Sequence, residues 1–274
     1  MASTARGDRA WRPSGVVTLT TDFGQRDAFV GVMKGVLLGI HPSVAPVDLT
    51  HEVAPQDVRA AAFHLRHAWR YFPRGSVHVA VVDPGVGSQR AILLALEDGH
   101  AFLAPDNGLL SGVLGPDAEV RALDVAAVAL PEPSRTFHGR DVFAPAAGRL
   151  ARGDAPSSLA TGAAQWQRLE WPAAVALPGG GFEAPVELLD RFGNAITALK
   201  GEELAAGSAR GWTARVRGRA IPLCGTYAEV EPGEALALLD SCGRWEIAVR
   251  DGDAGRRLGL AAGDRVQFQP GAGG

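Results

Sequence analysis

The 274-residue sequence has little of several features that would narrow its function at once. Its two cysteines, Cys224 and Cys242, allow at most one disulfide and lack metal-binding spacing. Lysine occurs only at Lys34 and Lys200, and a formal net charge of −3 is too small to indicate a nucleic-acid or membrane-surface partner. No apolar run is long enough to span a membrane, and residues 1–15 lack the apolar core of a signal peptide. We therefore expect a soluble cytoplasmic protein that binds no metal, nucleic acid or membrane.

Several familiar catalytic motifs are missing as well. The chain contains no G-x-S-x-G nucleophile elbow, no Walker loop and no G-x-G-x-x-G fingerprint. These absences set aside the serine hydrolases, the P-loop enzymes and the typical dinucleotide-binding proteins. What the chain does have is length and apolar content. Its 274 residues, 46% of them hydrophobic, suffice for one large or two ordinary domains with a substantial core.

The first half of the chain alternates between strand-like and helix-like patterns. Strands are expected over residues 16–20, 44–49 and 77–82, and helices over residues 29–40 and 56–72. This β-α-β-α-β order predicts a parallel sheet with helices on its faces. Because ligands bind at the carboxyl ends of the strands in such sheets, the residues that follow each strand are candidates for chemistry.

The pattern continues with shorter elements. A hairpin is expected over residues 91–96 and 101–104, then a short helix over 109–114, a strand over 120–123 and a helix over 142–150. Asp27 is the expected N-cap of the helix at 29–40. Asp141 or a neighbour is the expected N-cap of the helix at 142–150, which leaves His138 in the preceding loop.

Composition predicts two domains with a linker between them. We expect a flexible arm over residues 1–14, an α/β domain over 15–152, a linker rich in Gly, Pro, Ala and Ser over 153–182, and a smaller β domain over 183–270. The β domain has strand-like runs at 185–189, 195–199, 212–216, 236–239, 245–249 and 266–268, with one short helix near 255–258. Short strands separated by turns predict a mostly antiparallel sheet.

The most informative single stretch is GSVHVAVVDPGVGSQR, from Gly75 to Arg90. A buried strand there runs into Asp83-Pro84-Gly85, which cannot continue a central strand. Taken alone, Asp83 is typical of a turn cap, with Arg90 in solvent. However, Asp22 follows the first strand in the same way. Two carboxylates at neighbouring strand ends favour a pocket over an isolated turn.

One histidine stands out from the others. His138 lies ahead of a helix, in a polar loop with Arg140 and Asp141, and its side chain titrates near neutral pH. The remaining histidines are expected to be packed or solvated: His64 and His67 on a helix, His78 in a strand, His41 and His100 in turns, with His51 left open. Residues 190–194, DRFGN, are typical of an Asx turn with glycine in the left-handed conformation, and equally of a binding loop.

Seven stretches together resemble the S-adenosyl-L-methionine (SAM) hydroxide adenosyltransferase family, which is related to the SAM-dependent fluorinase and chlorinase. They are TLTTDFGQRDAFVGVMKG (18–35), VDLTHEVAPQDVRAAAF (47–63), YFPRGSVHVAVVDPGVGSQR (71–90), FLAPDNGLLS (102–111), FHGRDVFAPAA (137–147), LLDRFGNAIT (188–197) and SCGRWEIAV (241–249). These stretches occur in the family's order and span both expected domains.

The resemblance implies an N-terminal α/β domain, a C-terminal β-barrel-like domain and a homotrimer that holds SAM between subunits. It implies a catalytic set of Asp83, Arg90 and His138, and a ribose contact at Asp22. The further substrate contacts that it implies are Asp190, Phe192, Asn194, Ser241 and Glu246. Cys242 follows Ser241 where halogenating relatives often have an arginine, so the partner of the methionine carboxylate is left open.

The resemblance also implies a reaction: hydrolysis of SAM to adenosine and methionine by water or hydroxide at C5′, without metal or cofactor, because SAM is the substrate. Halogenating relatives carry an uncharged residue in place of Asp83, whose carboxylate would repel a halide. We expect Arg90 to lower the proton affinity of the water, His138 to accept the proton and Asp83 to orient the other two. Two alternatives stay open: a halide transferase of the same family, and a non-catalytic SAM- or adenosine-binding protein.

Overall fold

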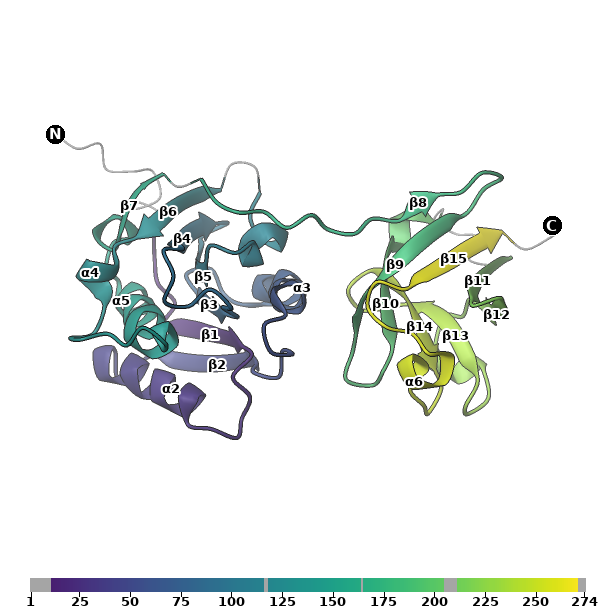
Figure 1. Cartoon of the computed structure of the whole chain (residues 1–274), viewed down its shortest axis with the longest axis horizontal. Coiled ribbons are helices and arrows are strands. Elements are labelled where there is room, and N and C mark those ends of the chain that lie inside the picture. Colours follow the sequence, from purple (N-terminus) through teal and green to yellow (C-terminus); the bar gives the residue numbers. More distant parts are fainter. Residues whose placement is uncertain (1–10, 116–117, 164, 205–210, 271–274) are drawn as a thin grey trace. The chain divides into compact units, whose positions relative to one another are not determined.

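The chain divides into two compact units, Met1–Glu170 and Trp171–Gly274, which are described separately. The computed structural model (Figure 1) describes residues 11–115, 118–163, 165–204 and 211–270. The division falls inside the segment that the sequence predicts to be a linker, residues 153–182. The expected fold class is confirmed: an α/β unit with parallel strands precedes a barrel-like antiparallel unit.

The first unit is built on a seven-stranded mixed sheet. Its strands are β1 (Val16–Thr21), β2 (Ala45–Thr50), β3 (Val77–Val81), β4 (Ile92–Glu97), β5 (His100–Pro105), β6 (Glu119–Leu123) and β7 (Ala160–Ala163), in the order β2-β1-β3-β5-β4-β6-β7. Strands β2, β1, β3 and β5 pair in parallel with one another, whereas the pairs β5-β4, β4-β6 and β6-β7 are antiparallel. Thr21 of β1 pairs with Val81 of β3, so the residues that follow these two strands emerge side by side.

Helices cover both faces of this sheet. The helices α2 (Phe29–Ile40) and α5 (Ala144–Arg152) pack together over one face, as Figure 1 shows. The helix α3 (Val58–Ala68) lies on the other face with the short helices η1 (Trp69–Tyr71) and η2 (Leu109–Gly112). The short helices α4 (Val125–Val128) and η4 (Pro156–Ser158) complete the unit, and η3 (Gly139–Phe143) leads into α5. Side chains alternate between the two faces of β3, so Val77, Val79 and Val81 all point into the core under α2 and α5.

Two predicted helix starts are wrong in detail. The residue before α2 is Ala28, with no side-chain cap, so Asp27 is not the N-cap. Helix α3 starts at Val58 rather than at Gln56, because Asp57 caps it by accepting the backbone N–H of Ala60 at 2.9 Å. Gln56 has φ +68°, a left-handed conformation that ends the preceding loop and excludes this residue from the helix.

The end of the expected flexible arm is packed against the fold. Residues 1–10 of the arm lie outside the described residues. Trp11 is buried, and its indole Nε1–H donates to the carbonyl of Leu150 at 3.2 Å. The backbone of this segment runs so close to Gly75 that a Cβ atom there would lie 2.0 Å from the carbonyl oxygen of Arg12. Position 75 therefore requires a glycine. Residues 11–14 therefore pack against the first unit and belong to it.

The second unit consists of antiparallel strands. They are β8 (Val175–Ala176), β9 (Phe182–Leu189), β10 (Ala195–Lys200), β11 (Trp212–Val216), β12 (Arg219–Pro222), β13 (Ala235–Leu239), β14 (Arg244–Val249) and β15 (Arg265–Pro270). The order β12-β11-β15-β9-β10-β14-β13 is nearly closed by a bridge between Leu223 and Ala237. Three short helices accompany the sheet: η5 (Gly201–Glu203), η6 (Tyr227–Glu229) and α6 (Ala254–Leu258).

Three short strands were not predicted from the sequence. Strands β7 and β8 lie inside the expected linker, where small residues pair with β6 and β9. Strand β12 follows β11 through a tight turn in which Arg217 and Gly218 both have positive φ. Such two-residue turns are usually marked by Asn-Gly or Asp-Gly, and Arg-Gly is not a strong hairpin pattern.

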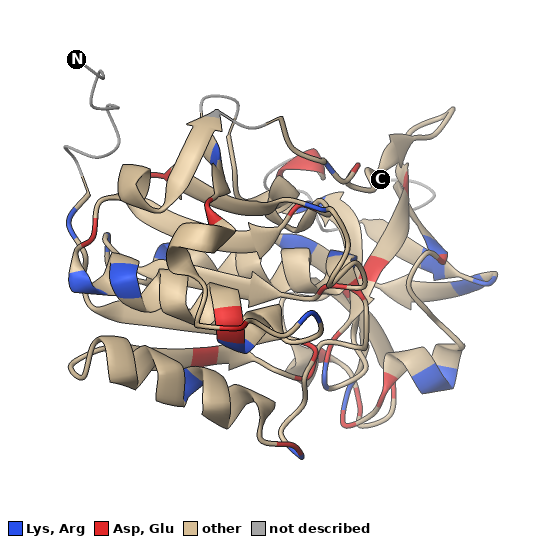
Figure 2. Ribbon diagram, turned by 60° about the vertical axis from the view of Figure 1, so that its left-hand side comes forward, with Lys and Arg blue, Asp and Glu red and all other residues tan. Residues whose placement is uncertain are grey.

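Charge is spread over both units, with basic and acidic residues interspersed along each ribbon (Figure 2). This distribution agrees with the small net charge of the sequence. None of the helices in the described ranges has the length and apolar character needed to cross a bilayer.

Candidate active site

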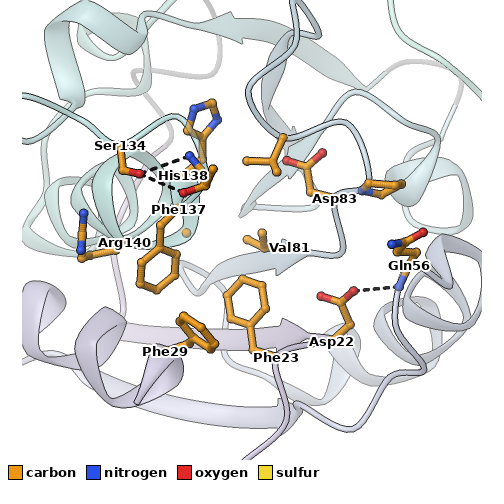
Figure 3. A pocket seen from close by; sticks show the side chains of 14 residues that line it. Asp22, Phe23, Phe29, Gln56, Val81, Asp83, Ser134, Phe137, His138 and Arg140 are labelled. Carbon is orange, nitrogen blue, oxygen red and sulfur yellow. Dashed lines mark hydrogen bonds between the residues drawn. The ribbon is translucent and has the colours of Figure 1, made fainter. Parts of the chain in front are cut away.

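Two carboxylates meet at the carboxyl edge of the first sheet. Asp22 follows β1 and Asp83 follows β3, and the pairing of Thr21 with Val81 brings them into one pocket (Figure 3). Asp22 Oδ2 accepts the backbone N–H of Gln56 at 2.8 Å, as the dashed line in Figure 3 marks. The left-handed backbone of Gln56 therefore helps to orient this carboxylate.

Asp83, Arg90 and His138 converge although they are far apart in the sequence. Arg90 Nε donates to Asp83 Oδ1 at 2.7 Å, and Arg90 Nη2 donates to Asp83 Oδ2, so the contact is bidentate. Arg90 Nη2 also lies 3.2 Å from His138 Nδ1. The guanidinium thus links the carboxylate to the imidazole.

Burial sets the electrostatics of this group. The side chains of Arg90 and Asp83 are only 8% and 5% exposed. Burial, followed by the charge of Arg90, lowers the pKa of His138 below its ordinary value of 6.5. The imidazole is therefore neutral at neutral pH, while the carboxylate and the guanidinium balance each other's charge.

The hydrogen bond from Arg90 also fixes the tautomer of His138. A guanidinium has only donors, so the 3.2 Å contact is a hydrogen bond only if His138 Nδ1 accepts. A neutral imidazole that accepts at Nδ1 carries its proton at Nε2. His138 consequently presents an N–H donor, and not a free lone pair, at the other side of its ring.

A wide helical turn holds His138 in place. The residues Gly139–Phe143 form a π-helical turn, closed by the N–H of Ala144 and the carbonyl of Gly139. Asp141 lies inside this turn and is not its cap, which corrects the prediction for the helix start. Its carboxylate is buried, accepts the N–H of Ser134 at 2.8 Å and pairs with Arg140. Such turns are frequent at functional sites.

The pocket has a volume of about 630 Å³ and two contrasting sides. Asp22 and Asp83 lie on one side, whereas Phe23, Phe29 and Phe137 form the other (Figure 3). The rest of the lining combines polar side chains with small or apolar residues: Gln56, Ser134, Thr136, His138 and Arg140, with Val81, Pro84, Val86 and Gly139. Arg90 lies behind Asp83 and is not among the lining residues.

Several pocket residues were not singled out from the sequence. Phe23 and Phe137 adjoin Asp22 and His138, but single aromatic residues beside a polar group carry no distinctive pattern. Phe29 is the first residue of its helix and is 45% exposed, so its position in the sequence does not mark it as a pocket residue. Gln56 was read as the start of a helix. Its role depends on a backbone conformation that composition does not reveal.

The other histidines have structural environments. His78 is fully buried, and its ring nitrogens lie 2.8 Å from Thr18 Oγ1 and 3.1 Å from His100 Nδ1. Burial lowers the pKa of His78 to about 3, so it stays neutral. The prediction that His100 is solvated is wrong. The hairpin turns at Asp98 and Gly99, which makes His100 the first residue of a buried strand.

The second unit brings together Asp190, Asn194 and Glu246, which the resemblance associates with substrate. Asp190 Oδ1 accepts the backbone N–H groups of Phe192 at 2.9 Å and Asn194 at 2.8 Å. Asn194 Nδ2 donates to Asp190 Oδ2 at 3.1 Å and lies 3.4 Å from the hydroxyl of Tyr227. The expected Asx turn is thus present, and Gly193 has φ +84° in it.

Glu246 is the most strongly perturbed acid of this cluster. It is 2% exposed, and the hydroxyl of Tyr227 donates to its Oε1 at 2.5 Å. Burial raises the pKa of Glu246 to about 6, and the negative charges of Asp240 and Asp190 add to the rise. Tyr227 was not singled out from the sequence.

Phe192 and Ser241 lie at the surface of the second unit. Phe192 is 75% exposed, which is unusual for a large aromatic side chain. Ser241 and Cys242 are exposed on the turn between β13 and β14. Arg244, the nearest arginine in the sequence, is buried and donates to the carbonyl of Ala198 at 2.7 Å.

Together the fold and the site define a class of two-domain proteins in which an α/β unit carries an Asp–Arg–His set at a pocket and a barrel-like unit follows it. Family models give this class its name. The model described as the SAM hydroxide adenosyltransferase N-terminal domain matches residues 17–160, and the model of the C-terminal domain matches residues 184–267. The chain belongs to the SAM hydroxide adenosyltransferase family.

Relatives agree over nearly the whole chain. A protein of Thermus thermophilus named (R)-S-adenosyl-L-methionine hydrolase is 41% identical over 92% of this chain and 98% of its own length. A crystal structure of an uncharacterized conserved protein from Thermotoga maritima superimposes with a TM-score of 0.84 at 32% identity, covering 93% of this chain and 99% of that one. A fluorinase of Nocardia brasiliensis is 26% identical over 93% of this chain and 97% of its own length.

Proposed function

We propose that this protein hydrolyses SAM to adenosine and L-methionine by attack of water at C5′. The observation that carries the proposal is the convergence of Asp83, Arg90 and His138 at a pocket that Asp22 also lines. The relative of Thermus thermophilus, which is named as a hydrolase of SAM, supports it at 41% identity. The fluorinase relative is considerably more distant, at 26% identity.

The substrate itself makes one half of the reaction easy. As the bond between the water oxygen and C5′ forms, the bond between C5′ and sulfur breaks and its electron pair returns to the sulfonium. Methionine therefore leaves as a neutral thioether and needs no acid to protonate it. One proton is released, from the attacking water. The task of the protein is to hold that water in line behind C5′ and to receive its proton.

The hydrogen-bond directions suggest a revised division of labour. His138 was expected to accept the proton, but its Nδ1 accepts from Arg90 and its Nε2 carries hydrogen. In the proposal, His138 Nε2–H donates to the water oxygen and orients it. Asp83 lines the pocket and has lone pairs that Arg90 does not use, so it receives the water proton and passes it to solvent.

Arg90 acts from behind these two residues. Its fixed charge stabilises Asp83 as a carboxylate and holds His138 neutral, in the tautomer that donates to water. It also favours the negative charge that develops on the attacking oxygen. Because the leaving group is neutral, the proposed chemistry requires no metal and no organic cofactor.

Binding of the remainder of the substrate is assigned to both units. Asp22 suits the ribose, because one carboxylate accepts hydrogen bonds from two neighbouring hydroxyls. Asp190, Phe192, Asn194, Ser241 and Glu246 are proposed to bind the adenine and methionine parts. The proposal includes the assembly that the resemblance implies, a homotrimer in which a neighbouring copy contributes its second unit to each site. A sedimentation mass of one or two chains for active enzyme would contradict that assembly.

Turnover in ¹⁸O-labelled water tests the reaction. We expect ¹⁸O in the 5′-hydroxyl of adenosine, with one methionine released per adenosine. Recovery of unchanged SAM from folded protein would count against the proposal and would favour a SAM-binding protein without turnover.

A halide transferase is the second candidate, and the geometry disfavours it. A halide entering the pocket would meet the carboxylate of Asp83 before the guanidinium behind it. Adding chloride or fluoride to the labelled-water reaction separates the two reactions. We expect no 5′-halogenated nucleoside, whereas its appearance in place of adenosine would make the enzyme a halide transferase.

A further inference from the structure

The aromatic side of the pocket has no role in the reaction as described so far. The rings of Phe23, Phe29 and Phe137 contact one another edge to face, with centroids 5.9, 5.9 and 5.3 Å apart. All three line the pocket, and Figure 3 shows them grouped across it from Asp83. A cluster of this kind, open to a cavity and not closed in a core, presents ring surface to a ligand.

The aromatic cluster adjoins the proposed catalytic residues in the sequence. Gly139 follows His138, and a Cβ atom there would lie 3.2 Å from the ring of Phe23 and 3.3 Å from that of Phe137. The absence of a side chain at this position lets the wide turn and the rings pack together. Phe29 begins α2 and remains 45% exposed, so its ring is not needed to fill the core.

The charges around the pocket favour a cationic guest. Asp83 is balanced by Arg90, and Arg140 is balanced by Asp141 through two hydrogen bonds of 2.6 and 2.8 Å. With His138 neutral, Asp22 is the remaining uncompensated charge among the lining residues. A pocket with one net negative charge and an aromatic side is suited to an alkylated cation.

One of the rings already contacts a cation. The guanidinium carbon of Arg140 lies 5.1 Å from the centroid of Phe137, within the usual range of a cation–π contact. That contact uses one face of one ring. The exposed ring of Phe29 and the ring of Phe23 offer their surfaces to the cavity itself.

We infer that Phe23, Phe29 and Phe137 form a sulfonium-binding wall, which holds the positively charged sulfur of the substrate opposite the attacking water. The inference rests on the proposed function, since it assigns the cation to SAM. The charge on sulfur disappears as methionine leaves. The wall therefore stabilises the substrate more than the transition state or the neutral products, and it distinguishes SAM from methionine, the thioether product.

Two unreactive analogues of equal shape test the wall without any turnover. In one, a CH–NH3⁺ group replaces the sulfonium S–CH3, and in the other a CH–CH3 group replaces it. Calorimetric titration of the full-length protein gives the ratio of the two affinities. For Phe29→Leu and for Phe137→Leu, we expect this preference for the cation to fall about two- to fivefold, the size of a partly exposed cation–π contact. Phe29→Tyr, which keeps a ring, retains the preference.

A matched control uses another exposed ring. Tyr71 is 85% exposed in η1 and lies outside the pocket, so Tyr71→Leu leaves both affinities unchanged. With SAM itself, Phe29→Leu raises KM and also raises kcat, by a smaller factor, because the bound substrate loses more stabilisation than the transition state does.

The outcomes separate this inference from the proposed function. Equal losses for the charged and neutral analogues in both ring variants would overturn the sulfonium-binding wall and leave an ordinary apolar contact, even if labelled adenosine still forms. A lost preference for the cation in a protein that never releases adenosine would support the wall and contradict hydrolysis. Circular dichroism of each variant confirms that the fold is retained.

Discussion

Two buried carboxylates, Asp83 in the first unit and Glu246 in the second, are stabilised in opposite ways. Asp83 receives two hydrogen bonds from a guanidinium, which supplies a full countercharge. Glu246 receives a hydrogen bond from a neutral phenol, and burial raises its pKa to about 6. The first arrangement favours the charged carboxylate, which keeps Asp83 ready to receive a proton in the proposed reaction. The second leaves a charge that pH or a bound cation can adjust, as suits a binding site.

Among single substitutions, the largest effect is expected where the countercharge is removed. Arg90→Ala leaves Asp83 buried without a cation and His138 without the donor that sets its tautomer. We expect kcat/KM for SAM to fall at least about 100-fold, roughly 3 kcal/mol of transition-state stabilisation. Arg256→Ala is the control, because that side chain is 90% exposed on α6. A fall in kcat/KM of less than about fivefold in Arg90→Ala would show that the mechanism does not depend on this fixed charge.

The next effect concerns stability in the second unit. Since the folded-state pKa of Glu246 is raised from 4.5 to about 6, the folded protein binds this proton more tightly than the unfolded chain. Glu246 therefore costs stability above pH 6, and the cost disappears as pH falls through 6 towards 4.5. We expect Glu246→Gln to increase the free energy of unfolding by about 1–2 kcal/mol at pH 8 and by nearly nothing at pH 4.5. Urea denaturation at the two pH values measures the difference, and equal changes would show that the carboxyl group is not perturbed.

The same substitution should weaken the substrate complex. If Glu246 contacts SAM, Glu246→Gln removes a charged acceptor and raises KM about tenfold, with kcat within twofold of the wild-type value. In the wild-type protein KM rises as pH falls through about 6, and in Glu246→Gln this dependence is lost. The kcat profile differs, because His138 becomes protonated only below its ordinary pKa of 6.5. A fall in kcat with unchanged KM would indicate that Glu246 takes part in the reaction itself. Glu246 and Asp83 would then no longer differ in role.

The smallest effect is expected from the phenol. Tyr227→Phe removes the hydroxyl that donates to Glu246 at 2.5 Å and lies 3.4 Å from Asn194 Nδ2. Because that hydrogen bond lowers the pKa of Glu246, its loss raises the pKa further. We expect the pH at which KM begins to rise to move upward, while KM at pH 8 changes less than about twofold. An unchanged pH profile of KM would show that the phenol does not control this carboxyl group.

The sequence predicts the fold well where hydrophobic period and strand ends agree. Strands β1 and β3 end near the predicted residues, and these ends position Asp22 and Asp83. By contrast, strand β7 is short and rich in small residues, so no apolar period distinguishes it from a linker. Strand β12 is hidden by an Arg-Gly turn that forms without the usual asparagine or aspartate. The helix at Phe29 starts without a polar cap, so the nearby Asp27 led to a wrong prediction of its N-cap.

The candidate site divides along similar lines. Asp83 and His138 are candidates from the sequence itself, but their grouping with Arg90 comes from the resemblance, because no local pattern predicts that a guanidinium will bridge residues so distant in sequence. The direction of the bridge, and with it the tautomer of His138, requires atomic positions. The role of Gln56 depends on a backbone angle, and that of Tyr227 on a contact between η6 and β14; composition encodes neither.

The wide turn at Gly139–Phe143 also fixes how many residues this segment needs in order to hold His138 beside Arg90. A π-helical turn holds one residue more than an α-helical turn, and each residue of an α-helix advances the chain by about 100°. Deleting one residue between Gly139 and Phe143 would let the segment relax to a regular helix and swing the imidazole of His138 away from Arg90. Such a protein should melt at a higher temperature and release no adenosine, whereas retained turnover would show that the spacing is neutral. We therefore expect the length of this one turn to matter for turnover as much as the side chains that it carries.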